Sequence, residues 1–93
     1  MKRKQAPTYT DIRKRSIERD GYRYTYTLLC SEEVCPIYSV RIRLLSSEGE
    51  ETTATLAQPI LDGGRAALLF EMLCENLVTP IDLAYVMEDM LDL

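Results

Sequence analysis

The side chains that most often carry chemistry are scarce in this chain, and their spacing matches no catalytic motif. There is no histidine and no tryptophan among the 93 residues. The cysteines are Cys30, Cys35 and Cys74, and they include no Cys-x-x-Cys pair of the kind that binds zinc. No serine lies in a nucleophile elbow. We therefore expect a protein that is not an enzyme and that holds no cofactor and no metal.

Two acidic features are the remaining candidates for chemistry. Asp62-Gly63-Gly64 precedes an expected helix, where an anion could bind, but it lacks the spacing of a phosphate-binding motif. A turn with a helix N-cap explains these residues better. Glu71 and Glu75 lie four residues apart, and like charges at that spacing usually mark a solvent-exposed helix face. Neither feature predicts a catalytic residue.

Charge is distributed unevenly along the chain. Residues 1–23 carry eight Lys/Arg and three Asp/Glu, whereas residues 24–93 carry three Lys/Arg and twelve Asp/Glu. The asymmetry indicates a basic N-terminal region and an acidic body. A basic patch on the solvent side of a sheet is one interpretation and a solvated, aggregation-resistant face is the other, while the pI of 4.8 argues against a dedicated nucleic-acid binder. The cations concerned are Arg13, Lys14, Arg15, Arg19, Arg23, Arg41 and Arg43.

The elements that must position these side chains begin with four strands, expected over residues 8–19, 22–30, 38–44 and 52–60. Asp20-Gly21 is a strong hairpin signal. Ile12 and Ile17 differ in parity, so either a bulge intervenes or only the second half of the first strand pairs. Pro59 is expected to end the fourth ladder. The alternating Tyr22, Tyr24 and Tyr26 could stack on nucleic-acid bases, but packing against helices is the preferred interpretation.

Two amphipathic helices are expected after the strands, joined at Leu77-Val78-Thr79-Pro80. Asn76 is a plausible stop because asparagine tolerates the left-handed conformation, and Thr79 is the expected N-cap of the second helix. The sequence thus predicts an α+β fold, an antiparallel meander of about four strands with a C-terminal two-helix hairpin packed on one face. The expected core is Tyr24, Tyr26, Leu28, Val40, Ile42, Leu56, Leu69, Phe70, Leu73, Leu83, Val86, Met87 and Met90.

One α+β domain over residues 8–93, preceded by a basic tail at residues 1–7, accounts for the length. No apolar run approaches the ~20 residues that span a bilayer. The N-terminus lacks the apolar segment of a secretory signal, so we expect a cytoplasmic protein without a membrane partner. Cys30 and Cys35 flank an expected hairpin end and could bridge, but an odd number of cysteines in a reducing compartment favours free thiols.

Three stretches carry a resemblance. They are the tyrosine-rich segment 22–28 with its trailing Glu32, the strand Tyr38-Ser39-Val40-Arg41-Ile42, and residues 73–83 around the Thr79-Pro80 joint. Together they resemble a family of short, functionally uncharacterised proteins of clostridial-type Gram-positive bacteria. The resemblance covers roughly residues 20–90. It implies a bacterial intracellular protein and transfers no activity, because the shared motifs are caps, turns and packing positions.

With no chemistry to assign, we expect a non-enzymatic interaction or regulatory module that acts on a protein partner. Leu68, Met72 and Met87 extend beyond one helical stripe and could form a partner groove or a homodimer interface. The alternatives are a small acidic inhibitor of a nucleic-acid enzyme, of the mobile-element type, and weak nucleic-acid binding by the basic N-terminal hairpin. The preferred interpretation is that this basic region pairs with acidic helix residues, either of the same chain or of a second copy of it. These residues are Glu71, Glu75, Glu88 and Asp89.

Overall fold

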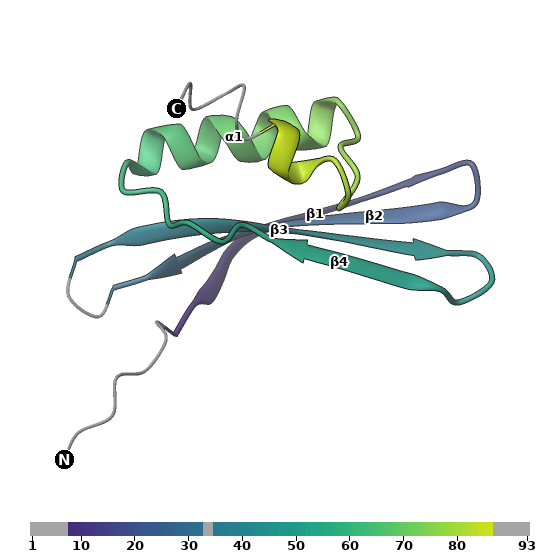
Figure 1. The fold of residues 1–93 in the computed structure, drawn as a ribbon, viewed down its shortest axis with the longest axis horizontal. Coiled ribbons are helices and arrows are strands. Elements are labelled where there is room, and N and C mark those ends of the chain that lie inside the picture. Colours follow the sequence, from purple (N-terminus) through teal and green to yellow (C-terminus); the bar gives the residue numbers. More distant parts are fainter. Residues whose placement is uncertain (1–7, 33–34, 87–93) are drawn as a thin grey trace, which may run out of the picture.

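The β1–β2 hairpin begins the fold, because Asp20 and Gly21 adopt the two left-handed conformations that a two-residue turn requires, with φ of 55° and 83°. A computed structural model describes residues 8–32 and 35–86. Figure 1 shows four antiparallel strands in the order β1-β2-β3-β4 with α1 across one face. The meander and the α+β class are therefore confirmed. The elements are β1 (Thr10–Arg19), β2 (Tyr22–Ser31), β3 (Ile37–Ser46), β4 (Glu51–Thr55) and α1 (Gly63–Glu75).

A β-bulge in β1 settles the parity of the two isoleucines. Asp11 pairs with Leu29 and Arg13 with Leu28, so Ile12 is the extra residue. Beyond the bulge Ile17 pairs with Tyr24 and packs against the core, whereas Ile12 stays 53% exposed. The turn register therefore places Ile17 on the core side, and the bulge changes the facing only of the residues that precede it, Thr10 and Asp11.

The fourth strand is shorter than the sequence predicted, and Pro59 does not end its ladder. Regular pairing stops after Leu56, whose N–H donates to Val40 O at 3.0 Å. The chain then bends out and returns at Ile60, which exchanges two hydrogen bonds with Tyr38 at 2.8 Å each. Proline is tolerated there because it lies in the bend, where no ladder bond needs its missing N–H.

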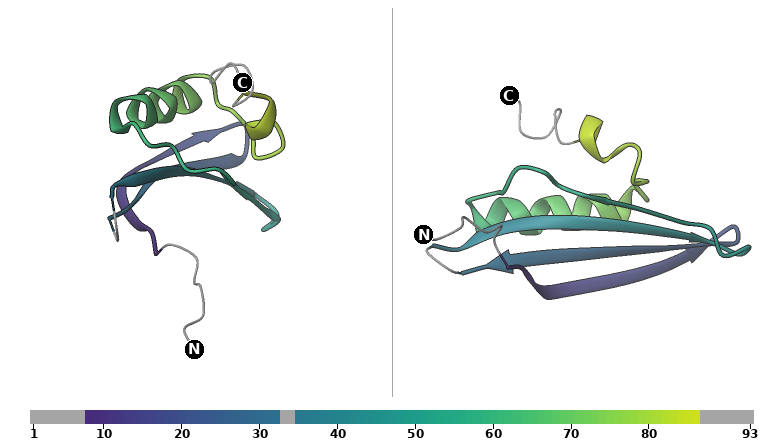
Figure 2. Two further views of the ribbon diagram at one scale, coloured as in Figure 1. Left: turned by 60° about the vertical axis from the view of Figure 1, so that its left-hand side comes forward. Right: turned by 60° about the horizontal axis from the view of Figure 1, so that its bottom comes forward.

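Helix α1 lies over β2 and β3, and none of the described residues forms a helix on the opposite face of the sheet (Figure 2). Tyr24, Leu56 and Val86 are only partly buried against the core, and Met87 and Met90 lie outside the described residues. The other expected core positions are confirmed, namely Tyr26, Leu28, Val40, Ile42, Leu69, Phe70, Leu73 and Leu83. The apolar residues of α1 recur every three or four positions and those of the strands every second position, so each element has one apolar face. These faces pack together as the buried layer between helix and sheet.

The Asp62-Gly63-Gly64 segment is a helix N-terminus with a structural explanation. The Asp62 carboxylate accepts from the N–H of Gly64 at 2.8 Å and of Arg65 at 3.4 Å, which is an N-cap. A Cβ at Gly63 would lie 2.9 Å from Tyr38 Oη, so any larger residue here would require the Tyr38 side chain to shift. These contacts agree with the turn and N-cap that the sequence favoured.

The helix ends as expected with Asn76 as its C-cap, but Asn76 has φ −101° and the left-handed residue is Leu77 with φ 49°. The N–H of Leu77 donates to Cys74 O and that of Val78 to Leu73 O, the two bonds of a Schellman motif. Asn76 Nδ2 instead donates to Met72 O at 2.9 Å. A left-handed leucine costs about 1–2 kcal/mol, which these bonds offset.

The second helix is described as one turn over residues 83–86, after a turn at 80–82. Val86 N–H donates to Asp82 O at 3.1 Å, so helical bonding begins at Asp82, three residues after the expected N-cap at Thr79. The Thr79 hydroxyl donates to Asp82 Oδ2 at 3.0 Å, a side-chain contact in place of the predicted backbone cap. The rest of the expected helix lies outside the described residues.

Candidate functional site

The cations that the sequence grouped as one basic patch are divided between two faces of the sheet. Arg13 and Arg15 pair with Leu28 and Tyr26, which belong to the core under α1, so both arginines lie on the helix face. The register puts Arg19 on that face as well. The predicted placement of these arginines on the solvent side was wrong, because the two-residue turn pairs Arg19 with Tyr22 and so puts residues 13, 15 and 19 on the face of Tyr24 and Tyr26. The face opposite α1, here called the outer face, carries Lys14, Arg23, Arg41 and Arg43.

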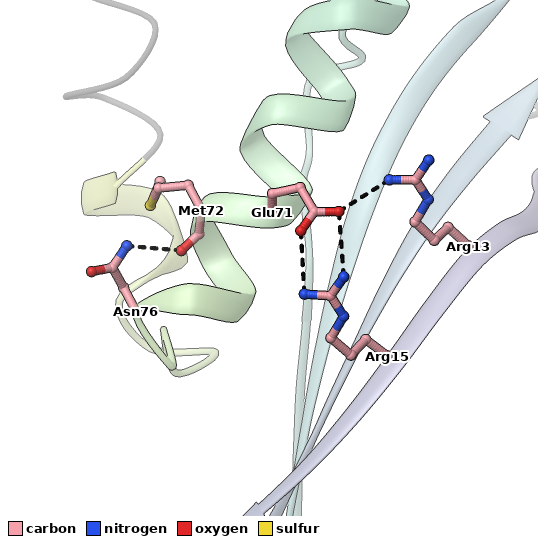
Figure 3. Close-up of polar contacts among 5 residues, drawn as sticks. All are labelled: Arg13, Arg15, Glu71, Met72 and Asn76. Carbon is pink, nitrogen blue, oxygen red and sulfur yellow. Dashed lines mark hydrogen bonds and ion pairs between the residues drawn. The ribbon is translucent and has the colours of Figure 1, made fainter.

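Arg13 and Arg15 converge on one carboxylate of α1, as Figure 3 shows. Their guanidinium groups approach the Glu71 oxygens at 3.1 Å and 3.2 Å. Both also lie over the buried Phe70 ring, 5.7 Å and 5.8 Å from its centre, which adds a cation–π contribution. The preferred interpretation of an internal pairing holds for this carboxylate. Glu75 is exposed, and Glu88 and Asp89 lie outside the described residues.

Replacing Glu71 with glutamine is expected to destabilise the fold slightly. The paired side chains are 37–51% exposed, so each pair contributes ~0.2–1 kcal/mol and is screened by salt. Urea unfolding at low and at high salt measures the effect, with Glu75→Gln as the matched control on the same helix. Equal midpoint shifts for the two variants at low salt would contradict the role of Glu71.

Two of the four cations named on the outer face, Arg23 and Arg43, form ion pairs within the chain. Arg23 donates to Glu18 at 2.6 Å and Arg43 to Glu51 at 2.6 Å. The hydrogen bond from Arg43 holds the pKa of the Glu51 carboxyl below its usual value. Lys14 and Arg41 have no ion pair among the described residues, and they flank the buried Thr27 in the register. The face therefore offers few free cations to a polyanion.

The alternating tyrosines do not form an open stacking platform. Tyr26 is fully buried and its hydroxyl donates to Val78 O at 2.9 Å, while burial raises its pKa above the ordinary value. The Tyr24 ring stacks on the Tyr26 ring with centres 6.4 Å apart. Tyr22 alone is largely exposed. The preferred packing interpretation is confirmed for Tyr26 and in part for Tyr24.

The remaining candidates for chemistry are the cysteines, possible metal ligands and a hollow at the surface. Cys30, Cys35 and Cys74 are free thiols, and burial raises the pKa of Cys74. The described residues contain no group of three side chains that could hold a metal ion. A hollow of about 420 Å³ lies at the hairpin ends and is lined by residues 18–23 and 45–47. The charged side chains Glu18 and Arg23 of this lining already form an ion pair with each other.

Exposed apolar side chains are concentrated in the part of the chain that covers the sheet, residues 61–85, here called the helical layer. Leu68 is exposed as predicted, whereas Met72 is partly buried against the core and cannot serve as a free surface. Met87 lies outside the described residues. Sequence reasoning missed three others, of which Ile81 and Tyr85 carry a signal because they fall off the apolar stripe of the expected second helix, whereas Leu61 belongs to no expected helix or strand. The most exposed large apolar residues are Leu61 at 73%, Leu68 at 68%, Ile81 at 77% and Tyr85 at 67%.

Comparison with known proteins gives a family and no activity. The model of a family of unknown function, DUF6514, matches residues 8–93. No curated protein and no solved structure matches the chain. Within residues 8–32 and 35–86, no helix is long and apolar enough to cross a membrane.

Proposed function

We propose that this chain, which belongs to the family of that model, is a non-enzymatic module that regulates or assembles with another protein through its helical layer. The observation that carries the proposal is the exposure of Leu61, Leu68, Ile81 and Tyr85 on that layer. Large apolar side chains that gather at the surface of a small domain are typical of a protein-binding surface. We further propose that the protein acts in the bacterial cytoplasm.

The acidic side chains of the same layer define the partner's chemistry. Asp62, Glu75 and Asp82 are exposed there, with Arg65 as their exposed cationic neighbour in the chain. A layer that exposes both apolar side chains and carboxylates complements a partner with apolar and basic side chains. Inhibition of a nucleic-acid enzyme through its basic channel is the specific form of this proposal that the acidity supports.

Direct nucleic-acid binding is the weaker candidate. Arg13 and Arg15 are engaged by Glu71, and Arg23 and Arg43 by other carboxylates. Each phosphate contact by one of these arginines would first break an ion pair within the chain. The free cations Lys14 and Arg41 are too few for the many phosphate contacts on which such affinity depends.

Affinity capture from a bacterial lysate, with and without nuclease, tests the proposal. We expect wild-type protein to retain a specific protein after nuclease treatment, and Leu68→Glu to lose it, because the new charge would be buried unpaired in the interface. Ile12→Glu is the matched control, since it makes the same change at an exposed apolar residue of the sheet. Capture that nuclease abolishes, or that Leu68→Glu leaves unchanged, would contradict the proposal.

A further inference from the structure

The two edges of the sheet differ in how they are protected against pairing with another chain. On one side β1 carries a bulge and a cluster of cations, two devices that keep edge strands apart. On the other side β4 is the last strand, and its residues are exposed except for the half-buried Ala54. Residues 52–55 are Thr-Thr-Ala-Thr, uncharged and rich in a residue that favours strands.

The hydrogen bonds of β4 determine which main-chain groups are open. Glu50 O accepts from Ser46 N–H and Leu56 N–H donates to Val40 O, so the even-numbered residues bond to β3. Hydrogen-bonded and non-bonded residues alternate along an antiparallel pair. Glu51, Thr53 and Thr55 therefore point their N–H and C=O groups away from β3, to the free edge of the sheet. Among the described residues no strand pairs with β4 there.

This edge is complementary to itself. In an antiparallel pair centred on Thr53, that residue faces its own copy, and Glu51 of each chain faces Thr55 of the other. Every outward N–H then meets an outward C=O, which no other register of this strand achieves. No like charges face each other, and each Glu51 keeps its ion pair with Arg43, since Arg43 donates to both of its oxygens.

We infer that this chain pairs with a second copy of itself along β4, antiparallel about a twofold axis at Thr53, so that two sheets become one. The twofold axis is perpendicular to the sheet, so both helical layers lie on the same face of the joined sheet. One short strand from each copy forms the contact, so the dimer is weak and depends on concentration. The pairing goes beyond the proposed function and does not depend on it.

Cysteine cross-linking tests the register. In the background of Cys35→Ser, which removes the exposed native thiol, Thr53→Cys places two thiols across the axis. Bonded antiparallel partners have Cα atoms about 5.5 Å apart, within the span of a disulfide. Thr55→Cys is the matched control, because its two copies would lie roughly 13 Å apart along the strands. We expect mild oxidation to give a covalent dimer with Thr53→Cys and to leave Thr55→Cys monomeric.

Light scattering on the wild type over a range of concentrations gives a second readout. A mass that rises towards the dimer, and that stays monomeric in Thr53→Pro, supports the pairing, because proline removes an outward N–H and no ladder bond of the chain itself. A circular dichroism spectrum like that of the wild type shows that the variant has folded. A monomer at all concentrations, or equal cross-linking at positions 53 and 55, would overturn the inference.

Discussion

Leu73→Ala is expected to lower the free energy of unfolding by ~2–5 kcal/mol, because it opens a cavity at the contact between α1 and the sheet. Leu73 is fully buried, and its carbonyl accepts the Val78 N–H that ends the helix. A loss of this size is a large fraction of the roughly 5–15 kcal/mol that stabilises a small domain. The variant should therefore unfold at a much lower urea concentration.

Leu68→Ala is the matched control for this variant, with the same replacement on the same helix. Leu68 is mostly exposed, so the change should stay within about 0.5 kcal/mol. Urea unfolding followed by circular dichroism compares the two midpoints. A Leu73→Ala midpoint equal to that of the parent protein would show that the core is assigned to the wrong face of α1.

Tyr26→Phe is expected to cost ~1–3 kcal/mol, because it leaves the buried Val78 carbonyl without its donor. The Tyr26 hydroxyl is the hydrogen bond that ties the middle of β2 to the joint after α1. The side chain keeps its volume in the variant, so the loss reports the polar contact alone. Thermal unfolding of Tyr26→Phe and Tyr22→Phe compares a buried hydroxyl with an exposed one, and similar melting temperatures would contradict the role of the bond.

The same tyrosine predicts a loss of stability in alkali. Burial raises the pKa of folded Tyr26 above the ordinary value of 10.0, so the folded state holds the proton more tightly than the unfolded state. Its contribution to stability is complete below pH 10 and falls as the pH rises above that value. Tyr26→Phe should lack this share of the alkaline decline, which a urea series at increasing pH would measure.

Local signals allowed the sequence to predict much of this fold. The Asp20-Gly21 turn needs only its own two backbone conformations, and the stripe around Leu69 and Leu73 needs only the helix period. The same turn also fixes the facing of Arg13 and Arg15, an implication that the predicted placement on the solvent side overlooked. What the sequence left open was whether a bulge or a partial pairing resolved the parity of Ile12 and Ile17.

The end of α1 and the end of β4 show the same limit. Asparagine is the better left-handed residue, yet Leu77 takes that conformation because the chain must then lead Val78 into the core. Pro59 suggests the end of a ladder, yet Ile60 rejoins β3 because a bend places the proline outside the pairing. Tertiary packing determines the conformation at both positions, and local residue propensities do not predict that packing.

The sequence predicted which kinds of side chain would form the candidate site, but it predicted the position of only some of them. Leu68 was identified from its position off the helical stripe, but Met72 shares that position and is covered. The exposed Ile81 and Tyr85 lie off the apolar stripe of the expected second helix, a signal that the sequence analysis did not use. The convergence of two arginines on Glu71 required both the register set by the Asp20-Gly21 turn and the placement of α1 over the sheet.

Site-specific photo-cross-linking in living cells tests the proposed contact surface most directly. A photoreactive amino acid is introduced at Leu68 on the helical layer and, separately, at Lys14 on the outer face, both exposed positions. We predict a cross-linked protein partner from position 68 that survives nuclease treatment, and none from position 14. A nuclease-sensitive product from position 14, with none from position 68, would contradict the account and favour binding of nucleic acid by the sheet.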